Sequence, residues 1–219
     1  MGTRLFSSRG LIVAAVFLLL GGILLAAILL QQREDAPEQT PPQVQETVLA
    51  PEVEAVLGTK VSLVAELLLD PVIIDGVQTA NQEHESISVE EILELDEKWR
   101  NTEGVDEFIE AFLDNDVARK LIEFQERYPG FSEIFVVDAH GLNVGQTNKT
   151  TDYYQADEDW WIGAYDEGRG KAFYGLIEFD ESAQTEAISL YIPVRDPADK
   201  KVIGVAKAVV KLATIKMEL

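Results

Sequence analysis

The chain contains no cysteine in its 219 residues. It therefore forms no disulfide, offers no thiolate to a metal, has no thiol nucleophile and carries no lipid on a cysteine. Basic residues are also scarce, because 18 Lys and Arg stand against 39 Asp and Glu and give a net charge of -21. Such a surface would repel a phosphate backbone, so nucleic acid is excluded as a partner.

Histidine is nearly absent as well. His84 and His140 are the only two, and they lie far apart in the chain. His140 follows Asp138 in a turn-like stretch and is interpreted as a turn residue, so we predict no metal site and no cofactor. The acidity has two interpretations: a solvated surface that keeps the protein soluble, and the weaker alternative of a preference for cationic ligands or divalent ions.

The length fits one ordinary domain with an appendage, and the hydrophobic content of 47% is typical of a globular protein. The uncharged run from Gly10 to Leu30 is long enough, at 1.5 Å per residue, to cross a hydrocarbon core of about 30 Å. A cleaved signal peptide would have a shorter apolar region and a small-residue cleavage motif, which this run lacks. We therefore predict an uncleaved transmembrane helix.

The charges around this run predict its orientation. Arg4 and Arg9 precede it, whereas Arg33, which follows it, is itself followed at once by acidic residues. The positive-inside rule places the N-terminus in the cytoplasm and the rest of the chain outside. We expect a single-pass protein of the inner membrane with a periplasmic C-terminal domain.

Changes in composition divide the chain into five predicted parts. They are a cytoplasmic N-terminus (1–9), the transmembrane helix (10–30), a proline-containing linker (31–45), a helical arm (46–130) and a final core with a sheet (131–219).

The arm is predicted to be helical because its apolar residues recur at helical spacing. One helix is expected within 46–70, interrupted at Gly58 and ended by Pro71. Ser88 and Glu91 form a capping box that starts another helix. The remaining expectations are helices over 105–113 and 117–128 and a connector over 75–86.

From Phe131 onward, short runs rich in β-branched and aromatic residues are separated by turn residues, which is typical of strands. The last two runs flank the turn-rich stretch 196–201, so they are expected to form an antiparallel hairpin. Helices followed by a five-stranded antiparallel sheet make the predicted fold class α+β. The expected strands are 134–137, 142–147, 171–179, 187–195 and 202–211.

The most unusual stretch is 152–161, which contains four aromatic and four acidic side chains in ten positions. This combination is typical of a pocket lining. Trp160 and Trp161 cannot point in one direction from a helix, so one can line a pocket while the other packs in the core; that both pack as structural anchors is an equally open alternative. The acids 157–159 could bind a cation or could favour a helix N-terminus.

Several short motifs follow one another in a set order. They are Glu133–Asp138 with Gly141, Thr147–Thr150, the stretch 152–161, Asp180–Ser182, Ile192–Asp196 and Ile203–Val205. This order resembles the Cache (PDC) family of extracytoplasmic sensors. The resemblance implies a PAS-like module that binds a small metabolite, with the preceding helices as its N-terminal arm. Members usually signal through a second membrane span to an output domain. Neither follows Val210 in these 219 residues, so we expect either that a partner transmits the signal or that the sequence is a fragment of a longer receptor that contains the output domain.

The resemblance also implies ligand-binding residues. Tyr153, Trp160 and Ala164 fall at the spacing of the amino-acid-binding members, with Trp161 at the position of the second aromatic. The predicted ligand-binding residues are Tyr153, Tyr154, Glu158, Trp160, Trp161, Asp180 and Arg195.

The expected charge of the ligand follows from one position at which this sequence differs from the amino-acid-binding members. Glu158 stands where those members have an arginine that binds the ligand carboxylate, and a glutamate would repel that group. Asp180 would receive a ligand ammonium. We therefore expect simple amines, or a neutral molecule held by stacking, to bind better than amino acids, unless Arg169 or Arg195 supplies the missing donor.

Two classes of function remain. The first is a membrane-anchored extracytoplasmic sensor of a small molecule that signals through a partner, either a second copy of the chain or a signalling protein. The second is a ligand-free structural or interaction protein of the cell envelope on a Cache-like scaffold. An enzyme is the least supported class, because Ser182 lacks the G-x-S-x-G elbow of a hydrolase nucleophile.

Overall fold

The computed structural model of the chain describes residues 49–180 and 185–219. The predicted transmembrane helix (10–30) and linker (31–45) lie outside the described residues. Within the described ranges, no helix is both long enough and apolar enough to cross a bilayer. Residues 47–219 form a compact unit of their own.

Five helices precede the sheet in the sequence. They are α2 (Pro51–Leu67), α3 (Pro71–Glu83), α4 (Val89–Asn101), α5 (Glu107–Leu113) and α6 (Asp116–Arg127). The last four each begin at a polar side chain that accepts a hydrogen bond from a backbone N–H of the first turn, which is worth about 1 kcal/mol per helix. The predicted capping box of Ser88 and Glu91 is confirmed, since both of its hydrogen bonds are present.

The connector expected over 75–86 was wrong, because most of it belongs to helix α3. Pro71 occupies the first position of this helix, where its missing N–H leaves no hydrogen bond unmade. The same proline therefore separates two helices instead of only ending one. The expected interruption at Gly58 is also absent, since α2 continues through it. The side chains that α3 buries recur at helical spacing: Ile73, Ile74, Val77 and Ala80.

The second half of the unit is one antiparallel sheet in the order β2-β1-β5-β4-β3. Its strands are β1 (Phe131–Asp138), β2 (Asn143–Gln146), β3 (Phe173–Asp180), β4 (Thr185–Arg195) and β5 (Val202–Lys211). The predicted α+β class and the five-stranded antiparallel sheet are confirmed, as is the hairpin between the last two strands. Three short helical segments complete the unit: α7 (Asp159–Tyr165), η1 (Asp166–Gly168) and α8 (Leu212–Met217).

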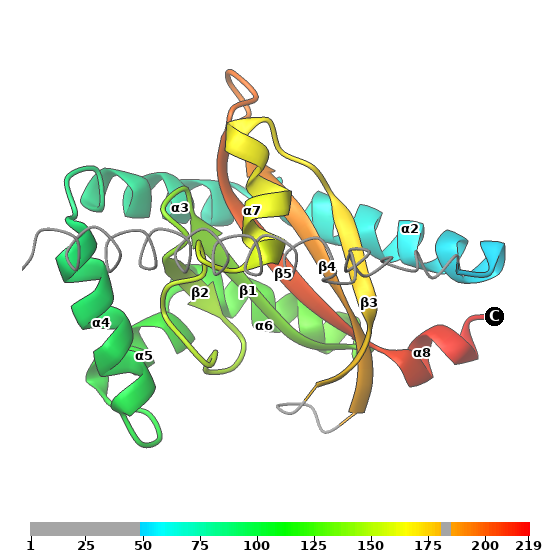
Figure 1. The fold of residues 1–219 in the computed structure, drawn as a ribbon. Helices are drawn as coiled ribbons and strands as arrows, with labels where there is room; N and C mark the ends of the chain where they lie inside the picture. The colour runs from blue at the N-terminus through cyan, green and yellow to red at the C-terminus, as the bar shows by residue number, and fades with distance from the viewer. Residues whose placement is uncertain (1–48, 181–184) are drawn as a thin grey trace, which may run out of the picture. The chain divides into compact units, whose positions relative to one another are not determined.

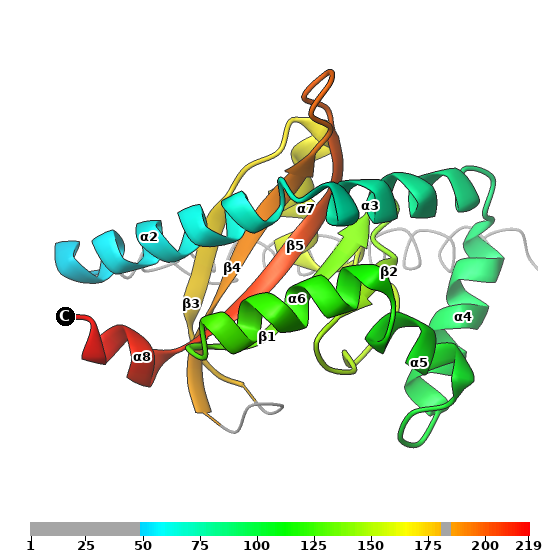
Figure 2. The same ribbon diagram turned by 180° about the vertical axis from the view of Figure 1, so that it is seen from behind.

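Helices cover the two faces of the sheet unequally. Helices α2, α3 and α6 lie on one face (Figure 2), whereas the short α7 lies on the other (Figure 1). Strand β5 shows the division, because Ala206 and Ala208 pack in the core under the long helices while Val205 packs with α7. We call the face under α7 the outer face. It is the less completely covered of the two, and the candidate site lies on it.

Candidate ligand-binding site

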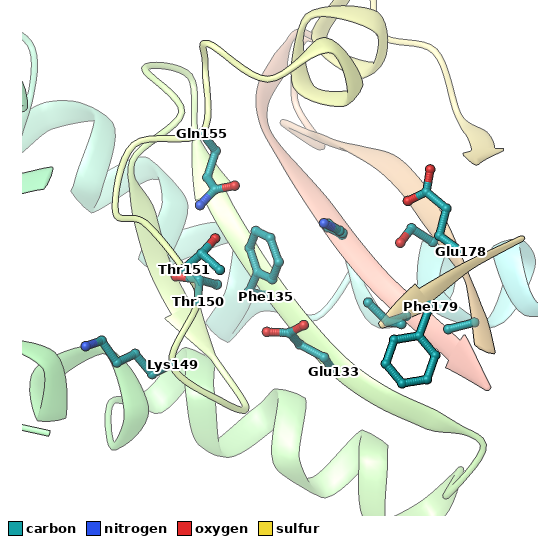
Figure 3. Close-up of a pocket in the computed structure, with 12 residues that line it drawn as sticks. Glu133, Phe135, Lys149, Thr150, Thr151, Gln155, Glu178 and Phe179 are labelled. Carbon is teal, nitrogen blue, oxygen red and sulfur yellow. The ribbon is translucent and has the colours of Figure 1, made fainter. Parts of the chain in front are cut away.

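Two adjoining cavities open on the outer face, between the sheet and the segment 149–160. Their volumes are about 310 and 300 Å³. They have four lining residues in common, which are Thr151, Gln155, Glu178 and Lys207. We therefore treat them as two lobes of one cleft, the outer cleft. Figure 3 shows the first lobe, with Thr150, Thr151 and Gln155 on one side, Glu178 on the other and Phe135 between them.

The floor of the outer cleft is a row of side chains from three neighbouring strands. The row runs in register through Phe135 of β1, Lys207 of β5 and Tyr191 of β4. Paired residues of neighbouring strands point to the same face, so the row forms one surface. The Lys207 ammonium lies 5.7 Å from the centre of the Phe135 ring and 5.5 Å from that of Trp160. The floor thus holds a cation between aromatic rings at its centre.

Acidic side chains line the cleft around this lysine. They are Glu133, Asp152, Glu158, Asp159 and Glu178. Among the described residues, none forms an ion pair with Lys207. Burial raises the pKa of Asp152, and the nearby Asp96 raises it further. Burial also raises the pKa of Glu158, followed by the charges of Asp152 and Asp157. The carboxylates therefore repel one another in a partly dry site, and a bound cation would relieve this repulsion.

Helix α4 fixes the segment that closes the cleft. The indole Nε1 of Trp99 donates to the carbonyl oxygen of Thr150 at 2.9 Å. The buried carboxylate of Asp96 accepts from the backbone N–H groups of Tyr153 and Tyr154 at 2.9 and 3.1 Å. These contacts join residues about fifty positions apart, so the segment is positioned by tertiary structure and not by its own local preferences.

Two of the predicted ligand-binding residues line the outer cleft. Glu158 lies at the start of α7, and Trp160 follows within its first turn. The Trp160 ring stacks on Tyr191 with ring centres 5.3 Å apart and an interplanar angle of 14°. Its edge faces Phe135 at 5.9 Å. Trp160 therefore forms a wall of the cleft and is supported by the floor.

The two predicted tyrosines lie elsewhere. Tyr153 is buried in a separate aromatic cluster with Trp99 and Phe112, at ring distances of 5.6 and 5.3 Å. Tyr154 forms an isolated β-bridge with Leu142. Neither tyrosine lines a lobe of the outer cleft.

Trp161 and Arg195 also lie outside the cleft lining. Trp161 stacks on Tyr165 of the same helix, α7, with ring centres 4.6 Å apart. The guanidinium of Arg195 donates to backbone carbonyls, including that of Arg169 at 2.7 Å, and so braces the loop after η1. Arg169 is itself paired with acidic neighbours. Asp180 ends β3, but its side chain is outside the described part of the structure.

The sequence interpretation did not identify the floor of the cleft. Lys207, Phe135 and Tyr191 fall in expected strands and are not among the predicted ligand-binding residues. A signal was present, since Lys207 is a charged residue at the centre of the otherwise apolar run Val202–Val210. A lysine inside a central strand is unfavourable unless its ammonium reaches an opening or a partner.

The structure brings the two histidines together, which their separation in the sequence did not indicate. Their ring centres lie 6.5 Å apart, and His84 Nδ1 lies 2.6 Å from a carboxylate oxygen of the buried Asp138. The backbone N–H of His140 donates to the same carboxylate within the turn. In the described ranges, no group of three or more His, Asp or Glu side chains is arranged to hold a metal ion.

No family model matches the chain. No curated protein matches it either. Solved structures with a similar fold include the ligand-binding domain of the Campylobacter jejuni chemoreceptor Tlp3 in complex with 4-methylisoleucine, with 14% identity over 77% of this chain and 64% of that one and a TM-score of 0.39. A second is the ligand-binding domain of the Pseudomonas aeruginosa PAO1 chemoreceptor PctB in complex with L-Arg, with 15% identity, 76% and 54% coverage and a TM-score of 0.40.

A third similar structure is an extracellular domain assigned to a histidine kinase, vpHK1S-Z8, with 8% identity, 76% and 55% coverage and a TM-score of 0.46. The chain spans less than two thirds of the length of these three structures. Two of these structures are ligand-binding domains of chemoreceptors, and the third is an extracellular domain.

Proposed function

We propose that the chain is an extracytoplasmic sensor domain that binds a small zwitterion, such as an amino acid, in the outer cleft. The observation that carries this proposal is Lys207. Its ammonium lies in the floor of an open cleft, in an aromatic setting, without an ion pair to a described carboxylate. A ligand carboxylate would provide the missing partner.

The proposed orientation of the ligand follows from the distribution of charge. Lys207 is the donor for a carboxylate, while Asp152 and Glu158 in the second lobe are acceptors for an ammonium. A pair of opposite charges 4 Å apart attracts by about 4 kcal/mol at the effective dielectric near a protein surface, so each end of a zwitterion gains where it meets its opposite. Trp160 would stack on the aliphatic part or face the ammonium.

This proposal replaces the simple amine that Glu158 alone led us to expect. An amine would meet Asp152 and Glu158 but would leave the Lys207 ammonium beside a second cation. A zwitterion satisfies both groups. The ligand-free scaffold is the alternative, and the absence of any stabilising small molecule in a broad screen would favour it.

The test uses the full-length chain in detergent micelles, titrated with amino acids and with their decarboxylated amines by calorimetry. We expect amino acids to bind more tightly than the matching amines, and Lys207→Met to weaken amino-acid binding at least tenfold, which corresponds to about 1.4 kcal/mol. Lys211→Met is the matched control: it lies on the same strand, four residues on, and does not line the cleft. Equal affinity of the amino acid for Lys207→Met and for Lys211→Met would falsify the proposed site.

We further propose that the predicted helix 10–30 anchors the domain and that a membrane partner carries the signal onward. The support is the uncharged run and the two arginines before it. Protease added outside intact spheroplasts should digest the domain. Complete protection of the domain would reverse the proposed orientation.

A further inference from the structure

A second cavity of about 500 Å³ lies between α3, the start of α6 and β2. We call it the α3 groove. It has no lining residue in common with the outer cleft, so the two are separate. Part of its lining is apolar, provided by Val72, Ala80, Phe112, Val117 and Val144.

The charge of the α3 groove differs from that of the outer cleft, because no Lys or Arg lines it. Its carboxylates are those of Asp75, Glu83 and Asp116. Asp116 is paired with Arg119, whereas Asp75 and Glu83 form no ion pair with any described residue. Both project from α3, eight positions apart, which corresponds to about 12 Å along the helix axis. A single metal ion cannot bridge that distance, in agreement with the lack of a metal-binding group among the described residues.

Tyr153 provides a second and independent indication of a ligand. Its side chain is only 2% exposed and lines the groove. Its hydroxyl forms no hydrogen bond with any described residue. Burial raises its pKa, and the charges of Asp138 and Glu83 raise it further, so the hydroxyl stays protonated and lies near the Glu83 end of the groove. Because this hydroxyl has no protein partner among the described residues, its oxygen is available to accept a hydrogen bond from an N–H donor of a ligand in the groove.

The remaining titratable group of the groove does not compete for such a ligand. His84 also lines the groove, but its Nδ1 is engaged with the carboxylate of Asp138 at 2.6 Å. The rings of Phe112 and Tyr153 lie 5.3 Å apart at the same end of the groove. Two aromatic rings, a hydroxyl and a carboxylate form a suitable environment for a protonated primary amine.

We propose that the α3 groove binds a linear polyamine. One terminal ammonium meets Glu83 and the Tyr153 hydroxyl, the methylene chain lies over the apolar lining, and a second ammonium meets Asp75. The separation of the two carboxylates selects an extended chain of about the length of spermidine over a short diamine. This site is independent of the proposed sensor function, because no residue is shared between the two cavities.

The experiment is a calorimetric titration of the full-length chain in detergent micelles with spermidine and with putrescine. We expect spermidine to bind more tightly than putrescine. The double variant Asp75→Asn and Glu83→Gln should weaken spermidine binding at least tenfold, and Tyr153→Phe, which removes only the hydroxyl, should weaken it several-fold. Thermal unfolding of each variant checks that the fold is retained.

The matched control removes the same two charges elsewhere. Glu90→Gln with Glu97→Gln changes two exposed carboxylates of α4 that line no described cavity, and it should leave spermidine affinity within twofold of the original. Equal losses in the two double variants would show only general attraction to an acidic protein and would overturn the proposal. Loss of spermidine binding in Glu158→Gln would also overturn it, because that result would place the polyamine against the carboxylates of the outer cleft.

Discussion

The outer cleft and the α3 groove are lined by neighbouring residues of one segment, yet their chemistry differs. Asp152 and Trp160 face the cleft, while Tyr153 faces the groove. The cleft combines acids with Lys207, whereas the groove has acids and no Lys or Arg. The cleft therefore suits a ligand with both charges and the groove a ligand with positive charges alone. The comparison shows that an acidic, aromatic stretch does not by itself determine which ligand binds. The charge of the ligand also depends on the residues that other strands and helices place opposite that stretch.

The largest expected effect is one that removes both sites together. Trp99 is fully buried, packs on Tyr153 and holds the carbonyl of Thr150, so it supports the segment that both cavities share. Trp99→Ala should lower the free energy of unfolding by about 3–5 kcal/mol, as for other buried tryptophans. Chemical denaturation measures this loss, and binding of both an amino acid and spermidine should weaken.

Leu93→Ala provides the control for this prediction, because Leu93 lies on the same helix and is 53% exposed. Its effect on stability should stay within about 0.5 kcal/mol. If Trp99→Ala weakened binding at one site and left the other intact, the shared support of the two sites would be disproved.

A smaller effect is expected for a substitution that weakens binding in the outer cleft but not in the α3 groove. Trp160→Ala removes a wall of the cleft that stacks on Tyr191 and faces Lys207. An aromatic face contributes roughly 0.5–2 kcal/mol to holding a cation, so amino-acid affinity should fall by about tenfold. Spermidine affinity should not change. Calorimetry of both ligands on the same preparation tests this, and a loss of spermidine binding would mean that the sites are coupled or are one.

The smallest effect concerns pH. The pKa values of Asp152 and Glu158 are raised by burial in the folded protein. The native state therefore holds more protons than the unfolded state just above the ordinary carboxyl pKa of about 4, so in the absence of ligand these groups lower stability as the pH rises through that range. A ligand ammonium favours the ionised carboxylates and should release protons on binding.

Calorimetry near pH 5 in two buffers with different ionisation enthalpies measures this proton release. Asp152→Asn should reduce it, and Asp199→Asn, an exposed carboxylate outside the cleft whose pKa is lowered by Lys201, should not. Proton release that is unaffected by Asp152→Asn would remove this residue from the ammonium end of the site.

Much of the fold could be predicted from the sequence, because it depends on short-range patterns. Short runs of β-branched and aromatic residues separated by turn residues predicted the positions of the strands, and the Ser88 capping box predicted the start of α4. The wrong prediction of a connector over 75–86 also has a local cause, because Pro71 is interpreted there only as the end of a helix. Asp70 before it accepts a hydrogen bond from the Val72 N–H, which is the signature of a helix start.

The candidate site could be predicted only in part. The adjacent tryptophans left two alternatives open, one lining a pocket or both packing as anchors; in the structure Trp160 lines the cleft, while Trp161 stacks on Tyr165 of the same helix. Nothing local distinguishes Tyr153 from Trp160, since both are aromatic residues of one acidic stretch. Asp96 and Trp99, which come from a helix more than fifty residues earlier in the chain, turn the segment so that the two face different cavities.

The sequence by itself determined the α+β class, the strands, the acidic surface and the exclusion of thiol and disulfide chemistry. These properties depend on composition and on the spacing of residues within one element. Only the tertiary structure decided that Lys207 lies between Phe135 and Tyr191, because the register of β5 with β1 and β4 joins residues far apart in the chain. The register is determined by how the side chains pack on both faces of the sheet. It decides that Lys207 lies on the outer face, and therefore that a ligand in the outer cleft meets a positive charge.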